Sequence, residues 1–173
     1  MKKIVVIGVA LVAFFSCSDG DLEIETLDFD STSIQDCGDI EPTTTNILFK
    51  INGDEALILE LQSGVLNNGN STTDTTETTS TIPSQSKLIY RVFSENVTSS
   101  YFCGEFPPAS PTVLEEIEAE DGSVIVKSIA VNDSTEFSHT IELSGISLVN
   151  TSGERITDLS INEFGEINTT ISN

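Results

Sequence analysis

From residue 45 onward, apolar and polar residues alternate along the chain with a period of two. Successive side chains of a β-strand point to opposite faces, so this period predicts strands with one buried face. The first such stretch, residues 46–52, places Phe49 and Ile51 on one face and Lys50 on the opposite face. The Asn52-Gly53-Asp54 sequence that follows is typical of a tight turn and predicts a hairpin. No window of about 11 residues shows a helical period, so we expect an all-β domain.

Further segments continue the alternation and are separated by short turn sequences. We expect strands at residues 87–94, 97–103, 112–120 and 124–131, followed by a pair of strands that begins at Thr135. Asp121-Gly122 is expected to reverse the chain, and the change of phase at Ser144-Gly145 predicts a bulge or bend. Short strands near Leu159 and Ile167 bring the total to about eight or nine, which favours an antiparallel, immunoglobulin-like β-sandwich.

Two segments interrupt this pattern. Residues 67–86 are rich in Ser and Thr, contain Ile82 as their one core-forming residue and exceed the usual length of a loop inside a compact domain. We expect them to form a disordered surface loop. Residues 106–111 contain three prolines, which cannot donate ladder hydrogen bonds, and are expected to cross between sheets in an extended conformation.

The first 17 residues have the pattern of an export signal. Lys2 and Lys3 form a positive n-region, and the 12 residues 4–15 form an uncharged apolar run. Because a membrane-spanning helix needs about 20 apolar residues, this run is too short to remain as an anchor. With Ser16 directly before Cys17, the stretch resembles the signal and lipobox of a bacterial lipoprotein. The resemblance implies a signal peptide of residues 1–16 and acylation of Cys17; the alternative is an ordinary secretory signal with an incidental cysteine.

The number of cysteines fits the lipoprotein interpretation. The chain has three, but a lipid on Cys17 would leave Cys37 and Cys103 as a pair in an oxidising compartment. A disulfide between them would stabilise the fold by roughly 4 kcal/mol through chain entropy, with Cys103 facing the core from its expected strand. Two free or metal-bound thiols are the alternative. Neither cysteine lies in a CxxC pair and His139 is the only histidine, so we predict no metal site.

Residues 18–36 carry seven acidic residues and no basic one. A segment so charged is expected to stay extended and mobile, so that residues 17–36 form a lipidated tether before a domain of residues 37–173. The acidic residues directly after Cys17 resemble the surface-export signal of Bacteroidota lipoproteins. This resemblance implies delivery to the cell surface; the alternative is a plain solvated spacer.

The acidic balance excludes nucleic acid as a partner. Without Lys2 and Lys3 the chain keeps five basic residues against 28 acidic ones. Phosphate binding requires clustered Lys and Arg, whereas these five are widely spread along the chain. The same charge would repel anionic membrane surfaces, so the expected membrane contact is the lipid on Cys17.

Three short sequences match the O-glycosylation motif of Bacteroidota, Asp followed by Ser or Thr and then a small or aliphatic residue. The candidate acceptors are Ser31, Thr75 and Ser134. Such matches also arise by chance in a chain rich in Thr and Asp, so a bare solvated surface is the alternative interpretation.

A longer pattern consists of YRVF, then YFCGEFPPASPTV, then a Glu-rich strand and a strand led by Gly-Ser-Val-Ile-Val. This pattern resembles a group of uncharacterised flavobacterial surface lipoproteins, in which a cysteine near the start of the domain also precedes a Tyr-Phe-Cys segment and a double proline. The resemblance covers roughly residues 37–150. It implies a small surface lipoprotein and transfers no catalytic residue.

Motifs for catalysis are sparse. A Ser-His-acid triad would have to use His139, which alternates with apolar neighbours and is therefore interpreted as a core residue. Glu116, Glu118 and Glu120 share one face of their strand, but glycosidase carboxylates converge across a cleft, so these three are interpreted as a solvated face. We expect no enzyme activity and no cofactor.

These features predict a non-catalytic lipoprotein of the outer membrane, a tethered β-sandwich with a binding or structural role at the cell surface and a protein or glycan as its ligand. The alternative is a glycan-binding accessory of a polysaccharide-uptake system. Glycan binding relies on aromatic platforms, and the chain has no Trp and two Tyr, with Phe106 as the best candidate. Exposed aromatics along one groove would favour this alternative.

Overall fold

The computed structural model of the chain describes residues 27–38, 40–68, 74–106, 108–132, 135–153, 155–156 and 162–170. In chain order, the elements within these residues are β1 (Asn46–Asn52), β2 (Glu55–Leu61), β3 (Thr76–Ile82), β4 (Lys87–Phe93), α1 (Ser99–Cys103), β5 (Val113–Asn132), β6 (Glu136–Val149), β7 (Arg155–Ile156) and β8 (Glu163–Thr170). Strand makes up 56% and helix 4%, so the predicted all-β class is confirmed. The immunoglobulin-like sandwich stays a prediction.

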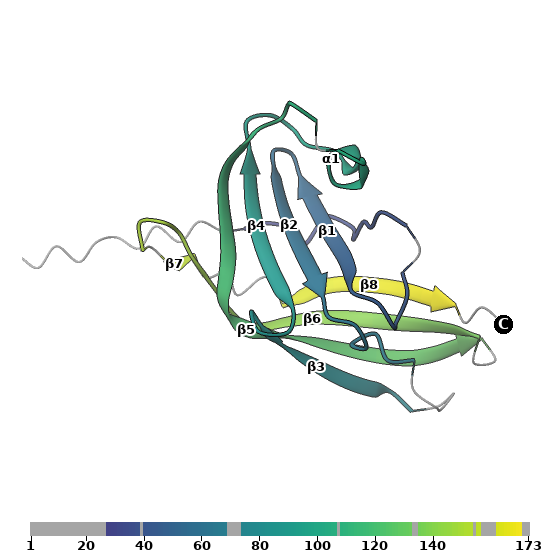
Figure 1. Cartoon of the computed structure of the whole chain (residues 1–173). Coiled ribbons are helices and arrows are strands. Elements are labelled where there is room, and N and C mark those ends of the chain that lie inside the picture. The colour runs from purple at the N-terminus through teal and green to yellow at the C-terminus, as the bar shows by residue number, and fades with distance from the viewer. Residues whose placement is uncertain are drawn as a thin grey trace, which may run out of the picture.

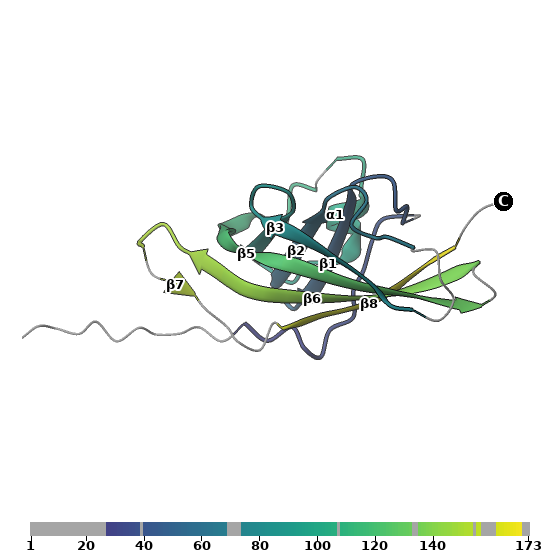
Figure 2. The same cartoon turned by 90° about the horizontal axis from the view of Figure 1, so that it is seen from below.

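The eight strands form one antiparallel sheet that is curled into a half-barrel (Figure 1). Its order is β1-β2-β4-β5-β6-β7, with β3 paired to β5 and β8 paired to β6. The predicted first hairpin is confirmed, because β1 pairs with β2 across the turn at Gly53 and Asp54. Seen from below, β3, β5, β6 and β8 run side by side as one layer (Figure 2).

Strand β5 joins the two halves of the sheet. Its first half pairs with β4, and its second half lies between β3 and β6. The expected reversal at Asp121-Gly122 is wrong, because β5 continues through these residues as one strand of 20 residues. The pairing with β6 shifts register there, and Gly122 has a φ of +132° that side chains rarely adopt. The turn-forming sequence therefore bends the strand between the two halves instead of ending it.

The partner strand β6 carries the irregularity that the sequence predicts at Ser144-Gly145. Asp121 pairs with Ser147 and Ser123 pairs with Ser144, so β6 contains one extra residue opposite the bend of β5. Gly145 has a φ of +64°, which suits a bulge. The predicted bulge is therefore confirmed.

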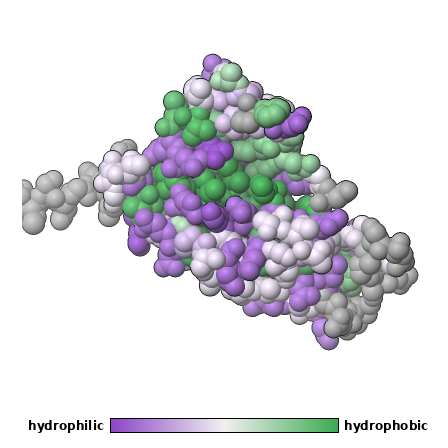
Figure 3. All heavy atoms as spheres, in the orientation of Figure 1, coloured by the Kyte–Doolittle hydropathy of each residue, from purple (hydrophilic) through white to green (hydrophobic). Residues whose placement is uncertain are grey.

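The main core lies inside the curl and combines side chains from both halves of the sheet. Its members without exposed surface come from β1, β2, β4, β5, β6 and β8: Leu48, Leu57, Leu59, Leu61, Leu88, Val124, Val126, Ile141 and Phe164. Removing apolar surface of this extent from water is the main favourable contribution to folding. In the view of Figure 3, polar residues cover the lower layer, whereas apolar residues gather above it.

A second, smaller cluster lies on the outer face of β1, β2 and β4, under helix α1. The Phe49 ring stacks on Phe102 with 4.5 Å between centroids, and the Phe93 ring meets Tyr101 edge-on at 4.9 Å. The strand expected at residues 97–103 is therefore wrong. This segment forms a short helix because its two aromatic residues cover apolar side chains that the sheet leaves on its outer face. Cys103, at the end of α1, is exposed rather than directed into the core.

Residues 27–36 cross the open side of the curled sheet, and we call them the N-terminal strap. Leu27 and Phe29 are each 1% exposed and belong to the main core, where the Phe29 ring meets Tyr90 edge-on at 6.4 Å. The expectation of a mobile tether up to residue 36 is thus wrong for the described residues from Leu27 onward. Its acidic residues lie outside, whereas the alternating Leu27 and Phe29 are buried.

The Ser/Thr-rich segment 67–86 is also more ordered than expected. Strand β3 lies inside it and pairs with β5 over its whole length. Ser80 and Ile82 face inward, and the buried Ser80 and Ser86 hydroxyls are 2.6 Å apart. β-Branched threonine favours extended backbone, which explains how this polar sequence adds an edge strand. The prediction of a disordered loop is wrong for residues 74–86.

Candidate functional site

The edges of β1 and β8 face each other across a seam that the N-terminal strap bridges. The two strands are not paired with each other. Gln35 exchanges two backbone hydrogen bonds of 2.8 Å with Phe49 of β1. The preceding residue, Ile34, packs directly against Gly165 of β8. A Cβ at Gly165 would lie 2.9 Å from Ile34 Cδ1, so glycine at this position allows the strap to approach β8 closely.

The seam contains a pocket of about 550 Å³. It is lined by the strap, by β1 and by the start of β8, through Asp30, Thr32, Ser33, Ile34, Lys50, Asn162, Glu163, Phe164, Gly165 and Glu166. A neighbouring hollow of about 450 Å³ shares Asn162 and Glu163 and extends toward Ile125 and Glu142. Pockets of 300 to about 1,000 Å³ are the usual size for sites that hold small ligands. This pocket is the candidate functional site.

Lys50 lies at the inner wall of the pocket. The residue is only 4% exposed, and its Nζ lies 5.8 Å from the centre of the Phe164 ring. Within the described part of the chain, Nζ makes no hydrogen bond and has no carboxylate oxygen within 4.0 Å. Burial lowers the pKa of Lys50, and the carboxylates of Asp30 and Glu163 oppose this shift. The pocket therefore presents a nearly buried cation without a direct partner.

The outer part of the pocket is acidic. Asp30 in the strap and Glu163 and Glu166 in β8 are exposed. Thr32, Ser33 and Asn162 also line the pocket and add hydroxyl and amide groups to it. Opposite charges thus occupy different depths of one pocket, which suits a ligand that carries both a negative and a positive group.

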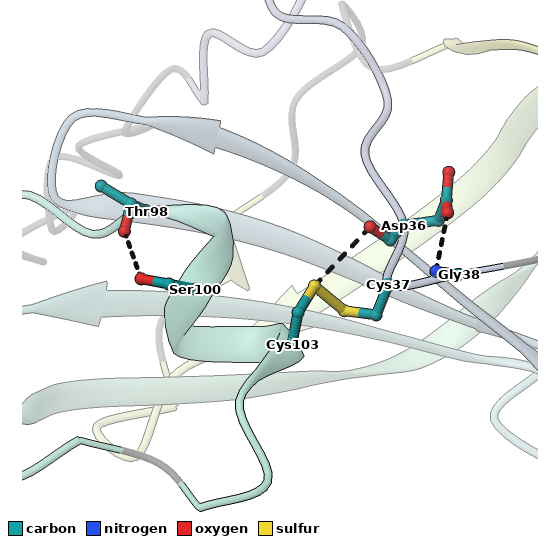
Figure 4. The surroundings of a disulfide bond; sticks show 6 residues. All are labelled: Asp36, Cys37, Gly38, Thr98, Ser100 and Cys103. Carbon is teal, nitrogen blue, oxygen red and sulfur yellow. Dashed lines mark hydrogen bonds between the residues drawn. A yellow bond between two sulfur atoms is a disulfide. The ribbon is translucent and has the colours of Figure 1, made fainter.

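The two cysteines expected to form a disulfide are bonded to each other, with 5.0 Å between their Cα atoms. Figure 4 shows that the bond joins Cys37, the residue directly after the N-terminal strap, to Cys103 at the end of α1. Cys103 Sγ lies 3.6 Å from the carbonyl oxygen of Asp36. The strap is therefore fixed at Leu27 and Phe29 by burial, and just beyond its other end by a covalent bond.

Other residues that the sequence singles out do not gather at the pocket. The candidate glycosylation residues Ser31 and Thr75 are exposed, whereas Ser134 and the candidate lipidation site Cys17 lie outside the described residues. Glu116, Glu118 and Glu120 are exposed on β5, and Glu116 accepts a 2.8 Å hydrogen bond from Arg91 Nε. The solvated face predicted for these glutamates is confirmed.

His139 is a core residue, as its alternation predicts, with no exposed surface. Its Nδ1 lies 2.7 Å from Ser128 Oγ and its Nε2 lies 2.8 Å from Thr169 Oγ1. Ser128 and Thr169 are themselves 1% and 3% exposed. Neither ring nitrogen meets a carboxylate among the described residues, so this group lacks the acid of a catalytic triad.

Sequence reasoning placed Lys50 on a face opposite Phe49 but missed its role. Strand β1, which contains Lys50, is apolar on both faces, because Leu48 belongs to the main core and Phe49 belongs to the cluster under α1. A lysine next to Leu48 and Phe49 in such a strand was the one available signal for a buried cation. The contribution of the strap had a signal as well, in the alternation from Leu27 to Asp30.

Comparison of the chain with protein-family models, with curated proteins and with solved structures gave no significant match. Within the described residues, no helix has the length and apolar character needed to cross a bilayer. The same residues contain no group of three His, Cys, Asp or Glu side chains arranged to hold a metal ion.

Proposed function

We propose that this chain is a non-catalytic lipoprotein of the cell envelope, anchored by a lipid on Cys17 in the outer membrane and displayed at the cell surface as a binding domain. One observation carries the proposal. The chain has three cysteines, and the bond between Cys37 and Cys103 leaves Cys17 as the remaining thiol. A disulfide favours an oxidising compartment, and the pattern before Cys17 is that of a lipoprotein signal.

The strap shortens the expected tether. Because Leu27 belongs to the core, ten peptide units separate the acylated cysteine from the domain, and they can span at most about 35 Å. The proposed anchor therefore holds the domain close to the bilayer surface. The acidic residues that follow Cys17 support export to the outer leaflet and would keep the domain from lying down on anionic headgroups.

Two arrangements support the finer description as a sandwich without catalytic function. The main core lies between the half of the sheet that contains β1, β2 and β4 and the half that contains β6 and β8. This arrangement is compatible with two packed layers joined through β5.

The only histidine is sealed in the core beside two hydroxyl groups, and the pocket holds one lysine among carboxylates. Both features suit a binding protein better than a hydrolase.

The glycan-binding alternative has weaker support from the aromatic residues. Phe106 is 78% exposed and remains a candidate platform. In contrast, Tyr90 is 1% exposed, Tyr101 packs on Phe93, and the aromatic residue of the pocket, Phe164, has no exposed surface. The described residues do not line a groove with exposed aromatics, so the binding lipoprotein stays our proposal.

Replacement of the proposed acylated residue tests the anchor. In Cys17→Ala cells, the protein is expected to lose metabolic labelling with a palmitate analogue and to move from the envelope fraction to a soluble or unprocessed form. Ser99→Ala is the control, because it changes an exposed residue outside the signal segment and should keep both label and location. Unchanged labelling and unchanged partitioning into detergent for Cys17→Ala would contradict the proposal.

A further inference from the structure

The side chain of Lys50 is nearly buried, and no described protein group gives its ammonium a counter-charge in direct contact. A charge taken out of water without a close partner is unfavourable, and the Phe164 ring at 5.8 Å compensates for only part of the loss. Lys50 lines an open pocket, so a ligand can reach its Nζ. A carboxylate on a ligand would form a charge-assisted hydrogen bond with this ammonium.

A simple anion would be poorly accommodated in the same pocket. Asp30, Glu163 and Glu166 lie around its outer part, and three carboxylates near one lysine give this wall an excess of negative charge. An anion without a positive group would be repelled by these side chains. A ligand that also carries an ammonium would turn this repulsion into attraction, because the ammonium would face the carboxylates while its own carboxylate faces Lys50.

The size of the pocket favours a ligand longer than a single charged group. The volume of about 550 Å³ lies within the range of small-ligand sites. Two peptide residues in an extended conformation separate their terminal charges by roughly 7 Å. Such a ligand carries its two charges at opposite ends. This matches a pocket with Lys50 at its inner wall and carboxylates at its outer part.

We propose that the pocket between β1, β8 and the N-terminal strap binds a small zwitterion of the amino-acid or short-peptide class. The ligand carboxylate pairs with Lys50 Nζ, and the ligand ammonium faces Asp30 and Glu163. Thr32, Ser33 and Asn162 line the same pocket and offer further hydrogen-bonding groups. The inference rests on the binding role proposed above but not on the lipid anchor, so failure of binding in solution and failure of anchoring in cells are separate results.

Calorimetric titration of the purified full-length chain tests the proposal with four defined probes. They are the dipeptide L-alanyl-L-alanine, its N-acetyl form without the ammonium, its C-terminal amide without the carboxylate, and galacturonate as a sugar acid. The free dipeptide is expected to bind at least tenfold more tightly than either blocked form and than galacturonate. Absence of heat from the dipeptide, equal binding of a blocked form, or tighter binding of galacturonate would overturn the proposal.

Two variants locate the site. Lys50→Met keeps the length and apolar stem of the side chain without its charge and is expected to weaken dipeptide binding at least tenfold. Lys127→Met is the matched control. Lys127 Nζ lies 2.7 Å from Glu142 Oε1, and Lys127 does not line the pocket, so this variant should bind the dipeptide as the unmodified protein does. Unchanged binding by Lys50→Met would place the ligand elsewhere and overturn the proposal.

A third variant keeps the test valid if Lys50→Met does not fold, which thermal unfolding would show. Glu163 is exposed at the rim, so Glu163→Gln should leave the fold intact. It is expected to weaken binding of the free dipeptide several-fold while leaving the N-acetyl form unaffected or slightly improved. An equal effect on both forms would mean that Glu163 does not face the ligand ammonium and would contradict the proposed orientation.

Discussion

His139 is held without charge inside the sheet, between the hydroxyl groups of Ser128 and Thr169. Thr169 Oγ1 in turn lies 3.1 Å from Asn68 Oδ1, to which it donates. Burial lowers the pKa of His139 from 6.5 to about 4, because the charged imidazolium would lose its hydration there. The folded state therefore binds this proton less readily than the unfolded state does.

This difference makes stability depend on pH with a defined sign. The contribution of neutral His139 is complete above the unfolded-state pKa of 6.5 and is lost as the pH falls toward the folded-state pKa of about 4. Between pH 7 and pH 5 the free energy of unfolding is expected to fall by about 2 kcal/mol from this residue. Urea unfolding of the protein and of the His139→Gln variant at both pH values measures this fall in the free energy of unfolding. An equal loss in both proteins would show that other groups cause the dependence.

Single residues differ in how far the sequence predicts their environment. His139 alternates with apolar residues in a strand that has one buried face, so its burial could be predicted. Lys50 could not be placed, because β1 is apolar on both faces and period two does not say which face meets the main core. The burial of Leu27 and Phe29 runs against the charge of their neighbours, which is typical of disorder. The tertiary contacts with Tyr90 and the rest of the core outweigh that charge.

At the scale of elements, the bend of β5 is the feature on which the arrangement of the sheet depends. Before the bend Ile117 and Ala119 are buried, and after it Val124 and Val126 are, so the inward-facing positions change from odd to even. The irregular pairing at residues 119–123 absorbs this change of phase. Gly122 makes it possible, because its backbone approaches Ile146 of β6 closely.

Substitution of Gly122 tests the bend. A Cβ at this position would lie 2.7 Å from Ile146 Cδ1 and 3.1 Å from its Cα, at a φ of +132°. Gly122→Ala is expected to lower the free energy of unfolding by about 2 to 4 kcal/mol through steric overlap and backbone strain. Gly145→Ala is the control, because its φ of +64° is also positive but no atom lies within 4 Å of the added Cβ, and it should cost only about 1 kcal/mol. Equal costs in chemical denaturation would rule out the overlap.

Elements formed by local patterns were predicted better than those formed by distant contacts. The β1–β2 hairpin follows from its turn sequence, and the β6 bulge from the change of phase at Ser144-Gly145. Helix α1 has only five residues and no helical period, and it is ordered by the rings of Phe49 and Phe93 beneath it. Strand β3 is polar, and only its pairing with β5 distinguishes it from a loop.

At the scale of the whole molecule, the strap completes what the sheet leaves open. It contributes Leu27 and Phe29 to the core, pairs with β1 through Gln35, and forms one wall of the pocket. The disulfide at Cys37 joins its end to α1, which itself covers the outer face of the sheet. The two faces of the sheet, the pocket and the segment that leads toward Cys17 are therefore mechanically connected.

The disulfide should carry much of the stability of this closed arrangement. It joins residues 66 positions apart, so its removal restores a large loop-closure entropy to the unfolded chain, and Cys37→Ser is expected to lower the free energy of unfolding by about 2 to 5 kcal/mol. Cys103→Ser and the double variant should match it, because each change removes the same bond. In hydrogen exchange the strap amides should then open before those of β5. Cys17→Ser is the control and should not alter stability. Complete alkylation of both Cys37 and Cys103 without a reductant, seen by mass spectrometry, would contradict the bond and this account of how the strap is held.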